Sequence, residues 1–169
     1  MIDWTPTLLQ CAPNVHPDTM ARIIRVESRG NPYAISINGG KRALRRQPRN
    51  QAEAVATAAA LTRAGYGISV GLAQIEWRNL GRYGIRHWEP AFDPCVNLAL
   101  AGQILGRFYH ADLRRLQAQG HAAPQSAALI AAISRYNTGH PAQGLRNGYV
   151  GRVLQAAPTP VFALKGSHL

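Results

Sequence analysis

The pattern of apolar and polar residues first becomes regular between residues 19 and 31, where it has the period of an α-helix. Met20, Ile23 and Ile24 fall on one face of this helix, and Glu27 occupies the next position on that face. A His-Pro-Asp sequence before the segment is typical of a helix start, and Gly-Asn-Pro at its end is typical of a helix stop. The pattern therefore places a carboxylate on the inward face, in the last turn.

This position changes the chemistry expected of Glu27. Burial disfavours an ionised carboxylate, and so does the negative end of the helix dipole, so the pKa of Glu27 should be raised. A carboxylic acid that stays protonated near neutral pH can act as a general acid. The alternative is an ordinary ion pair with Arg22, Arg25 or Arg29 at the rim of the helix.

Further elements follow from the same pattern. Residues 1–15 are expected to form a short helix, and residues 33–40 alternate before turn residues, which predicts a strand that begins a hairpin. A second long helix is expected to begin at Asn50 and to end at Gly65. Its packing face is expected to consist of small residues, namely Ala52, Val55, Ala56, Ala59 and Ala60.

The second half of the chain is predicted to be mainly helical. Residues 66–75 are extended and rich in turns, and residues 76–80 form a short helix or turn. Asp93 and Pro124 begin two longer helices, and residues 141–156 form a final one. The inward stripe of the helix after Asp93 consists of Leu98, Gly102, Leu105 and Tyr109. The inward face of the helix after Pro124 consists of Leu129, Ile130, Ile133, and Tyr136 or Asn137.

These elements indicate an α+β fold that is mainly α, with one small β-hairpin element, in a single domain spanning residues 1–157. Residues 158–169 are expected to form a tail, and its Lys-Gly-Ser-His-Leu ending is compatible with a vector origin. No apolar run is long enough for a transmembrane helix. Because the first residues lack the layout of a secretory signal, either the protein is cytosolic or a signal has been removed.

The charge of the chain points to an acidic partner. Nineteen Lys and Arg residues against eight Asp and Glu residues give a net charge of +11. This favours nucleic acid, anionic lipid or an anionic cell-wall polymer, and charge alone does not choose among them. Residues 41–49 contain five cations and form either a phosphate-binding hairpin or a solvated loop. The absence of interleaved aromatic residues from this segment argues against nucleic acid.

The two cysteines, Cys11 and Cys95, leave two possibilities open. As a pair they would close a loop of about 85 residues, worth roughly 4–5 kcal/mol, and would imply an oxidising compartment. Otherwise they are two buried free thiols. They form no Cys-x-x-Cys motif, and the six histidines lack the spacing of metal ligands, so we expect no metal and no cofactor.

Four ordered motifs resemble those of soluble lytic transglycosylases, a family with a lysozyme-like fold. They are Glu-Ser-Arg-Gly-Asn-Pro-Tyr-Ala-Ile-Ser (27–36), Gly-Leu-Ala-Gln-Ile (71–75), Phe-Asp-Pro-Cys-Val-Asn-Leu (92–98) and Ile-Ser-Arg-Tyr-Asn-Thr-Gly (133–139). The resemblance covers roughly residues 10–155. The helix before the second motif and the Asn-Gly-Tyr-Val sequence at residues 147–150 are similar to the branch associated with type IV secretion and conjugation systems.

The resemblance implies a role for each matching residue. Glu27 corresponds to the single catalytic acid, and Ser36 to a serine near the substrate and the catalytic carboxyl. Gln74 corresponds to a glutamine that lines the sugar groove. Tyr136 corresponds to a tyrosine whose hydroxyl orients the catalytic Glu, and Asn137 follows it in the same motif. Where the family often has methionine this chain has an alanine, which implies a smaller substrate contact at Ala73.

The resemblance also implies a reaction and a location. The family cleaves the β-1,4 bond between N-acetylmuramic acid and N-acetylglucosamine in peptidoglycan without water and leaves a 1,6-anhydro product. Its expected partners are glycan strands and other type IV secretion subunits, not nucleic acid. Because peptidoglycan lies outside the cytoplasm, the resemblance favours a periplasmic protein whose signal has been removed, with Cys11 and Cys95 paired.

Glu76 departs from the expected motif, since an uncharged polar residue is expected there. Glu76 is interpreted either as a solvent-facing residue paired with Arg78 or as a second carboxylate that would make the protein a lysozyme-type hydrolase.

Beside these two enzymatic functions, transglycosylase and hydrolase, a third possible function is that of a module that binds peptidoglycan during assembly without turnover. Residues 38–70 form an insertion that either covers the groove or docks a partner.

Overall fold

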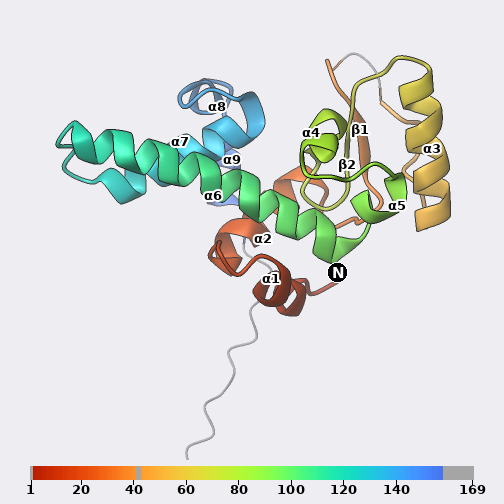
Figure 1. Ribbon diagram of the computed structural model, residues 1–169, viewed down its shortest axis with the longest axis horizontal. Helices are drawn as coiled ribbons and strands as arrows, with labels where there is room; N and C mark the ends of the chain where they lie inside the picture. Colours follow the sequence, from red (N-terminus) through yellow and green to blue (C-terminus); the bar gives the residue numbers. More distant parts are fainter. Residues whose placement is uncertain (1, 41–42, 158–169) are drawn as a thin grey trace, which may run out of the picture.

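The computed structural model describes residues 2–40 and 43–157, and this part of the chain is mainly helical (Figure 1). The helices are α1 (Thr5–Cys11), α2 (Pro17–Glu27), α3 (Gln51–Arg63), α4 (Trp77–Arg82), α5 (Trp88–Ala91), α6 (Pro94–Ala118), α7 (Pro124–Thr138), α8 (Gln143–Arg146) and α9 (Tyr149–Gln155). The strands are β1 (Ile35–Ile37), β2 (Ile68–Val70) and β3 (Ile75–Glu76). The expected tail at 158–169, and the first two residues of the basic segment 41–49, lie outside the described residues.

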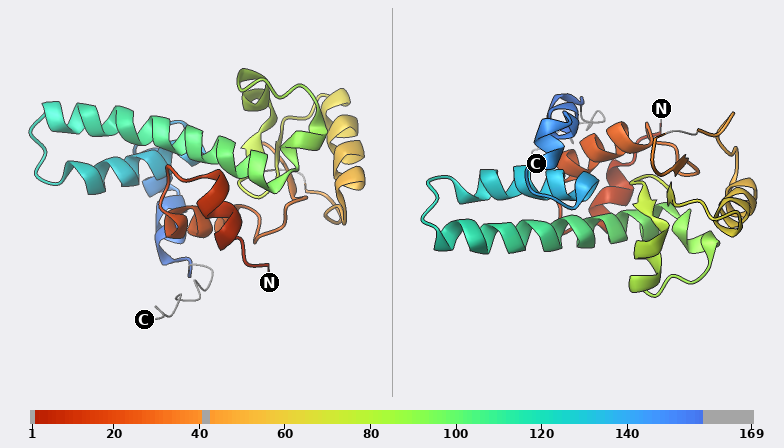
Figure 2. Two further views of the ribbon diagram at one scale, coloured as in Figure 1. Left: turned by 60° about the horizontal axis from the view of Figure 1, so that its bottom comes forward. Right: turned by 90° about the horizontal axis from the view of Figure 1, so that it is seen from above.

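Helix α6 is the long central element of the fold, as the sequence predicts. It runs beside α7 on one side of the molecule, and its first turns lead away from the small sheet and α3–α5 on the other (Figures 1 and 2). Asp93 caps α6, because its Oδ1 accepts a hydrogen bond of 2.9 Å from the Val96 amide. Leu98 and Leu105 are buried in the core, and Tyr109 is half-buried at its edge. The helix thus joins the two parts between which the candidate site lies.

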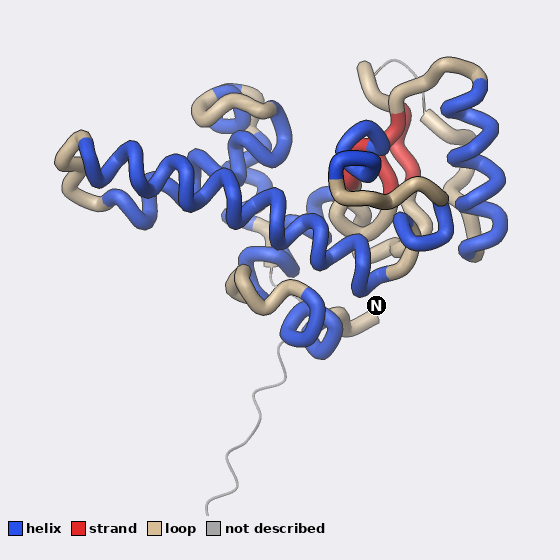
Figure 3. Tube along the Cα trace, in the orientation of Figure 1, coloured by secondary structure: helices blue, strands red, loops and turns tan. Residues whose placement is uncertain are grey.

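The three strands form an antiparallel sheet in the order β1-β2-β3, set among the helices (Figure 3). The expectation that β1 begins a local hairpin is wrong, because Ser36 pairs with Ser69 of β2, beyond α3. On its other edge, β1 meets a side chain: the Ile35 amide donates to Gln47 Oε1 at 2.8 Å, and Gln47 Nε2 donates to the Ile35 carbonyl at 3.0 Å. The side-chain amide of Gln47 thus makes the two hydrogen bonds to Ile35 that a neighbouring strand would make, in the place of a hairpin partner.

Helix α3 begins and ends as predicted, but its packing face differs from the predicted one, of which Val55 packs on the core. Ala54 and Ala58 are fully buried, whereas Ala52 and Ala56 are exposed. Leu61 explains the difference. It lies seven residues after Ala54 and packs on the core, so it continues the Ala54–Ala58 stripe and turns that face inward.

Residues 141–156 form two short helices instead of the single helix expected. The break lies at Asn147 and Gly148, where Gly148 has a φ of +76° that glycine adopts without strain. Asn147 Oδ1 accepts a hydrogen bond of 2.9 Å from the Tyr149 amide. This turn makes Tyr149 the first residue of α9, and its side chain is buried.

A disulfide bond joins Cys11 to Cys95, as the family resemblance implied. It ties the end of α1 to the first turn of α6 across 84 positions of sequence, with the two Cα atoms 5.2 Å apart. Asn14 supports the same contact, because its Nδ2 donates to the Gly102 carbonyl at 3.0 Å. In the part of the chain described here, no helix combines the length and apolarity needed to cross a membrane.

Candidate active site

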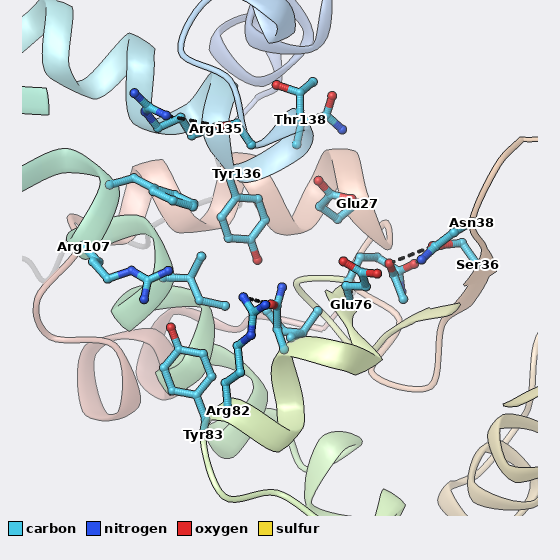
Figure 4. Close-up of a pocket in the computed structure, with 18 of the residues that line it drawn as sticks. Glu27, Ser36, Asn38, Glu76, Arg82, Tyr83, Arg107, Arg135, Tyr136 and Thr138 are labelled. Carbon is cyan, nitrogen blue, oxygen red and sulfur yellow. Dashed lines mark hydrogen bonds between the residues drawn. The ribbon is translucent and has the colours of Figure 1, made fainter. Parts of the chain in front are cut away.

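A cleft of about 710 Å³ opens between the helices and the sheet, and Glu27 lies on its wall (Figure 4). Glu27 is the last residue of α2, and the inward residues before it, Met20, Ile23 and Ile24, are buried in the core. Residues from β1, β2, β3, α4, α6 and α7, and from the turns next to them, line the rest of the cleft. The helix pattern therefore directs the Glu27 carboxylate from the core toward an open groove.

Burial raises the pKa of Glu27 from 4.5 to about 7, as the sequence predicts in direction. A hydrogen bond from Tyr149 and the charge of Arg152 act in the opposite direction but do not cancel the effect of burial. Arg22 does not form the rim ion pair with Glu27 that was the alternative interpretation. Its Nη1 instead donates to the carbonyls of Leu154 and Ala156 at 2.7 and 2.6 Å. Near neutral pH, Glu27 can therefore both donate and accept a proton.

Tyr149, and not Tyr136, makes the hydrogen bond to the Glu27 carboxylate. The Tyr149 hydroxyl donates to Glu27 Oε1. The Tyr136 hydroxyl instead donates to the Ala73 carbonyl at 2.7 Å, which corrects the orienting role expected of Tyr136. Tyr136 still lines the cleft and points into it (Figure 4). No role was predicted for Tyr149, although it directly follows the Asn-Gly turn at residues 147–148, which could have drawn attention to it.

Gln74 and Ser36 lie together on the wall of the cleft. Gln74 has a φ of +50°, which is unusual for a residue other than glycine. Its Nε2 donates to the carbonyls of Ala34 and Gly71, each at 3.0 Å, and its Oε1 accepts a hydrogen bond of 2.6 Å from the Ser36 hydroxyl. These contacts hold the backbone in a strained conformation, which is a common property of functional sites.

Asn97 fixes the loop that carries Gln74, and the sequence alone did not single it out. Its Oδ1 accepts from the Ala73 amide at 2.9 Å, and its Nδ2 donates to the carbonyls of Val70 and Ala91 at 3.1 and 3.0 Å. The side chain is 1% exposed. A Cβ atom at Gly71 would lie 2.2 Å from Asn97 Nδ2, so this close approach requires glycine.

Glu76 lies in the cleft and not at a solvent-facing ion pair. The sheet register aligns Ser36, Ser69 and Glu76 in one row across the three strands, and all three line the cleft. Among the described residues, none of the ion pairs includes Glu76 or Arg78. Figure 4 shows Glu27 and Glu76 on the same side of Tyr136, reaching the cleft from different elements. The cleft thus holds two carboxylates.

The cleft carries a side chain, Glu27, that can transfer a proton. Within residues 2–40 and 43–157, no group of three or more His, Cys, Asp or Glu side chains is arranged to hold a metal ion. Besides the carboxylates of Glu27 and Glu76, the cleft lining includes hydroxyl, amide and phenol groups, which can donate and accept hydrogen bonds with the hydroxyl and acetamido groups of sugars.

Comparison with known proteins identifies the family. Residues 8–154 match the family model described as the transglycosylase SLT domain. The chain belongs to this family. The lysozyme-like, mainly α fold with a small β-element that the sequence predicts is therefore confirmed. No solved structure is a significant match to the chain.

Several relatives of this SLT-domain chain carry the name of one secretion component. The chain is 38% identical over 162 residues to the type IV secretion system protein virB1 of Brucella abortus biovar 1 (strain 9-941), which covers 93% of this chain and 65% of that protein. It is 38% identical over 149 residues to protein virB1 of Agrobacterium fabrum, covering 88% and 56% respectively. The chain therefore spans less than two thirds of the length of these relatives.

Of two further residues expected to contact the substrate, Ala73 lies outside the cleft and Asn137 lines it. Ala73 is fully buried and does not line the cleft, so its side chain is not placed to make the substrate contact expected of it. What Ala73 contributes is its carbonyl and amide, which Tyr136 and Asn97 bind. Asn137 does line the cleft, and its Oδ1 accepts a hydrogen bond of 3.0 Å from Asn147 Nδ2.

Proposed function

We propose that this protein is a peptidoglycan lytic transglycosylase in which Glu27 is the single proton donor and acceptor. The observation that carries the proposal is the half-buried Glu27 carboxyl beside the cleft, with a pKa of about 7 and a hydrogen bond from Tyr149. The substrate would be the β-1,4 bond between N-acetylmuramic acid and N-acetylglucosamine, as it is for the family that the motifs resemble.

In the first step, protonated Glu27 gives its proton to the glycosidic oxygen as the bond breaks. The sugar passes through an oxocarbenium-like state, and in most glycosidases a second carboxylate then acts as nucleophile or as the base that activates water. The 2-acetamido group of the muramic residue stabilises the oxocarbenium-like state here, so no enzyme nucleophile is required. Ser36, Gln74 and Asn137 line the cleft and are suited to contact the sugar.

In the second step, the Glu27 carboxylate takes the proton of the C6 hydroxyl, and this oxygen closes the 1,6-anhydro ring. The step returns Glu27 to its protonated form, so protons balance over the cycle. A group that acts as acid and then as base works best when its pKa is near the working pH. The value of about 7 satisfies both demands.

The biological setting follows from the relatives and from the disulfide. The virB1 protein of Brucella abortus is named as a type IV secretion system protein, which supports a role in opening the cell wall for such an apparatus. The Cys11–Cys95 disulfide supports an oxidising compartment, and we assign the protein to the periplasm. Glycan strands and secretion subunits are then its partners, and the insertion at residues 38–70 is a candidate surface for the latter.

Replacing Glu27 with Gln tests the proposal. We expect Glu27→Gln to abolish the release of muropeptides from purified sacculi, because glutamine cannot donate the proton, while the melting temperature stays equal or rises. Glu89→Gln is the matched control, since Glu89 is exposed on α5 and lies outside the cleft. Retention of release by Glu27→Gln would refute the assignment of Glu27 as the catalytic acid. Full biological activity of Glu27→Gln despite the loss of release would favour a module that binds peptidoglycan without turnover.

A second candidate function is hydrolysis by a lysozyme-type mechanism, and the position of Glu76 favours it. Because Glu76 shares the cleft with Glu27, it could activate a water molecule on the other side of the sugar. Under this mechanism Glu76→Gln loses activity, and the products of the unmodified protein are one water heavier than anhydromuropeptides. Under the transglycosylase mechanism, Glu76→Gln retains most of its activity.

A further inference from the structure

Two arginines line the cleft and form no ion pair with a carboxylate in the described part of the chain. Arg82 ends α4 and Arg107 lies on α6, and both are exposed. Among the residues that the structure describes, neither takes part in an ion pair. Two positive charges therefore face the groove and are available to a ligand.

A third arginine in the same cleft is already neutralised by the fold. Arg135 Nε donates to Asp112 Oδ2 at 2.8 Å, and its Nη1 donates to the Gly139 carbonyl at 3.2 Å. The Asp112 side chain is 2% exposed, so this ion pair is part of the packing between α6 and α7. Unlike Arg135, Arg82 and Arg107 form no ion pair within the part of the chain that the structure describes, so their charges are not neutralised by a carboxylate there.

Local contacts orient both guanidinium groups. Arg82 Nη1 lies 3.5 Å from Asn79 Oδ1, and the Arg107 guanidinium lies over the Phe108 ring, 5.7 Å from its centroid. Figure 4 shows that Ser36, Asn38 and Glu76 lie on one side of Tyr136, whereas Arg107 and Tyr83 lie on the other, with Arg82 beside them. One part of the cleft is thus acidic or neutral, and another part is basic.

We propose that Arg82 and Arg107 bind carboxylates carried by the glycan strand and make the enzyme prefer strands that bear them. The inference rests on the proposed function. A peptidoglycan strand offers such groups from two sources. Its stem peptides carry free carboxylates, and each muramic residue has a lactyl carboxylate that becomes free where the peptide has been removed.

The chemistry of arginine suits this role. A guanidinium group binds a carboxylate through two parallel hydrogen bonds, which fix orientation as well as charge. The Glu76 carboxylate lies in the other part of the cleft and repels a second carboxylate there, so an acid-bearing sugar or peptide is favoured near the arginines. The two arginines would therefore fix the register of the strand relative to Glu27, and an uncharged polymer would lack this contact.

The test compares strands with and without their carboxylates. Peptide-bearing strands and strands freed of peptide by an amidase are each used untreated and after conversion of the carboxylates to carboxamides. We expect the conversion to lower kcat/KM of the unmodified protein about fivefold, the range for exposed charge pairs. The Arg82→Gln, Arg107→Gln double variant should have a lower kcat/KM on untreated strands and should not distinguish treated from untreated ones.

Two exposed arginines outside the cleft provide controls. Arg86→Gln and Arg114→Gln remove the same charge without touching the cleft, and should respond to the conversion as the unmodified protein does. The strand type on which the arginine dependence appears identifies the source of the carboxylate. Either of two results overturns the inference. In the first, the conversion to carboxamides lowers kcat/KM of the double variant as much as that of the unmodified protein. In the second, the conversion lowers kcat/KM of neither protein.

A binding measurement separates this inference from the proposed function. The same strands are titrated against Glu27→Gln protein, with and without the two arginine substitutions. Loss of carboxylate-dependent affinity on removing the arginines supports the inference even if no strand is turned over. Turnover of every strand with no such dependence leaves the proposed function standing and refutes the inference.

Discussion

The hydroxyl of Tyr149 donates a hydrogen bond to Oε1 of Glu27, across 122 positions of the sequence. It joins the first residue of α9 to the last residue of α2. The turn at Asn147 and Gly148 makes this contact possible, because it ends α8 and starts a new helix at the tyrosine. The C-terminal helices therefore belong to the candidate site and do not only cover the core.

Tyr149→Phe tests the importance of this contact. The hydrogen bond lowers the pKa of Glu27 against the larger effect of burial, so its loss should raise that pKa above about 7. Since Glu27 must be protonated to start the reaction, the loss of activity on the alkaline side should move to higher pH. The kcat/KM at neutral pH should fall roughly tenfold because the carboxyl is no longer oriented. Rates of muropeptide release between pH 5 and pH 9 provide the measurement.

Tyr136→Phe is the matched control for this shift. Its hydroxyl binds the Ala73 carbonyl, so the substitution should leave a buried acceptor without its donor and destabilise the fold by about 1–3 kcal/mol. The alkaline limb of the pH profile should stay where it is in the unmodified protein. A shift of the limb in Tyr136→Phe and not in Tyr149→Phe would reverse the roles assigned to the two tyrosines.

Glu27 should also make stability depend on pH. Its pKa is about 7 in the fold and 4.5 when unfolded, so ionisation opposes folding. The cost is absent below about pH 4.5 and is fully present above about pH 7, where it amounts to about 3 kcal/mol. Glu27→Gln should therefore be more stable than the unmodified protein at pH 8 and equally stable at pH 4.5. Urea denaturation at both pH values decides this, and an equal difference at both would contradict it.

Glu53 should show the opposite dependence. The hydrogen bond from Arg46, followed by that from the Arg49 amide, lowers the pKa of Glu53 to about 2, and Asn50 Oδ1 accepts from the Glu53 amide at 2.9 Å to complete the helix start. Its contribution to stability is present above about pH 4.5 and is lost as the pH falls toward 2. Glu53→Gln should melt below the unmodified protein at pH 7, and the gap should narrow by pH 3. A gap that widens in acid would refute this account.

The ends of several helices and the inward position of Glu27 could be predicted from local sequence, whereas most long-range contacts could not; the Cys11–Cys95 pairing was expected only from the family resemblance. The ends of α2, α3 and α6 depend on capping residues next to them in the chain, and the inward position of Glu27 depends on the period of one helix. The Tyr149 contact and the pairing of β1 with β2 depend on packing between segments far apart in the sequence. The local periodicity of apolar residues carries no information about such packing. Asn97 was missed for the same reason, since its three partners lie in other segments.

The disulfide should stabilise the fold without affecting the chemistry. In the chain-entropy model, a crosslink between Cys11 and Cys95 is worth roughly 4–5 kcal/mol. The double variant Cys11→Ser, Cys95→Ser should therefore melt roughly 10 °C lower, while the alkaline limb of its activity stays in place because the contacts of Glu27 are unchanged. Melting curves with and without reducing agent give the measurement. A melting temperature that neither the reductant nor the substitutions lower would contradict the prediction.

The central claim is that Glu27 serves both halves of a reaction in which no water takes part. Digestion of purified sacculi in water enriched in heavy oxygen, followed by mass spectrometry of the products, tests it most directly. Ring closure by the C6 hydroxyl predicts anhydromuropeptides that contain none of the label, and their absence when Glu27→Gln protein is used. Products that carry one heavy oxygen from the solvent and are one water heavier would contradict the claim and identify a hydrolase.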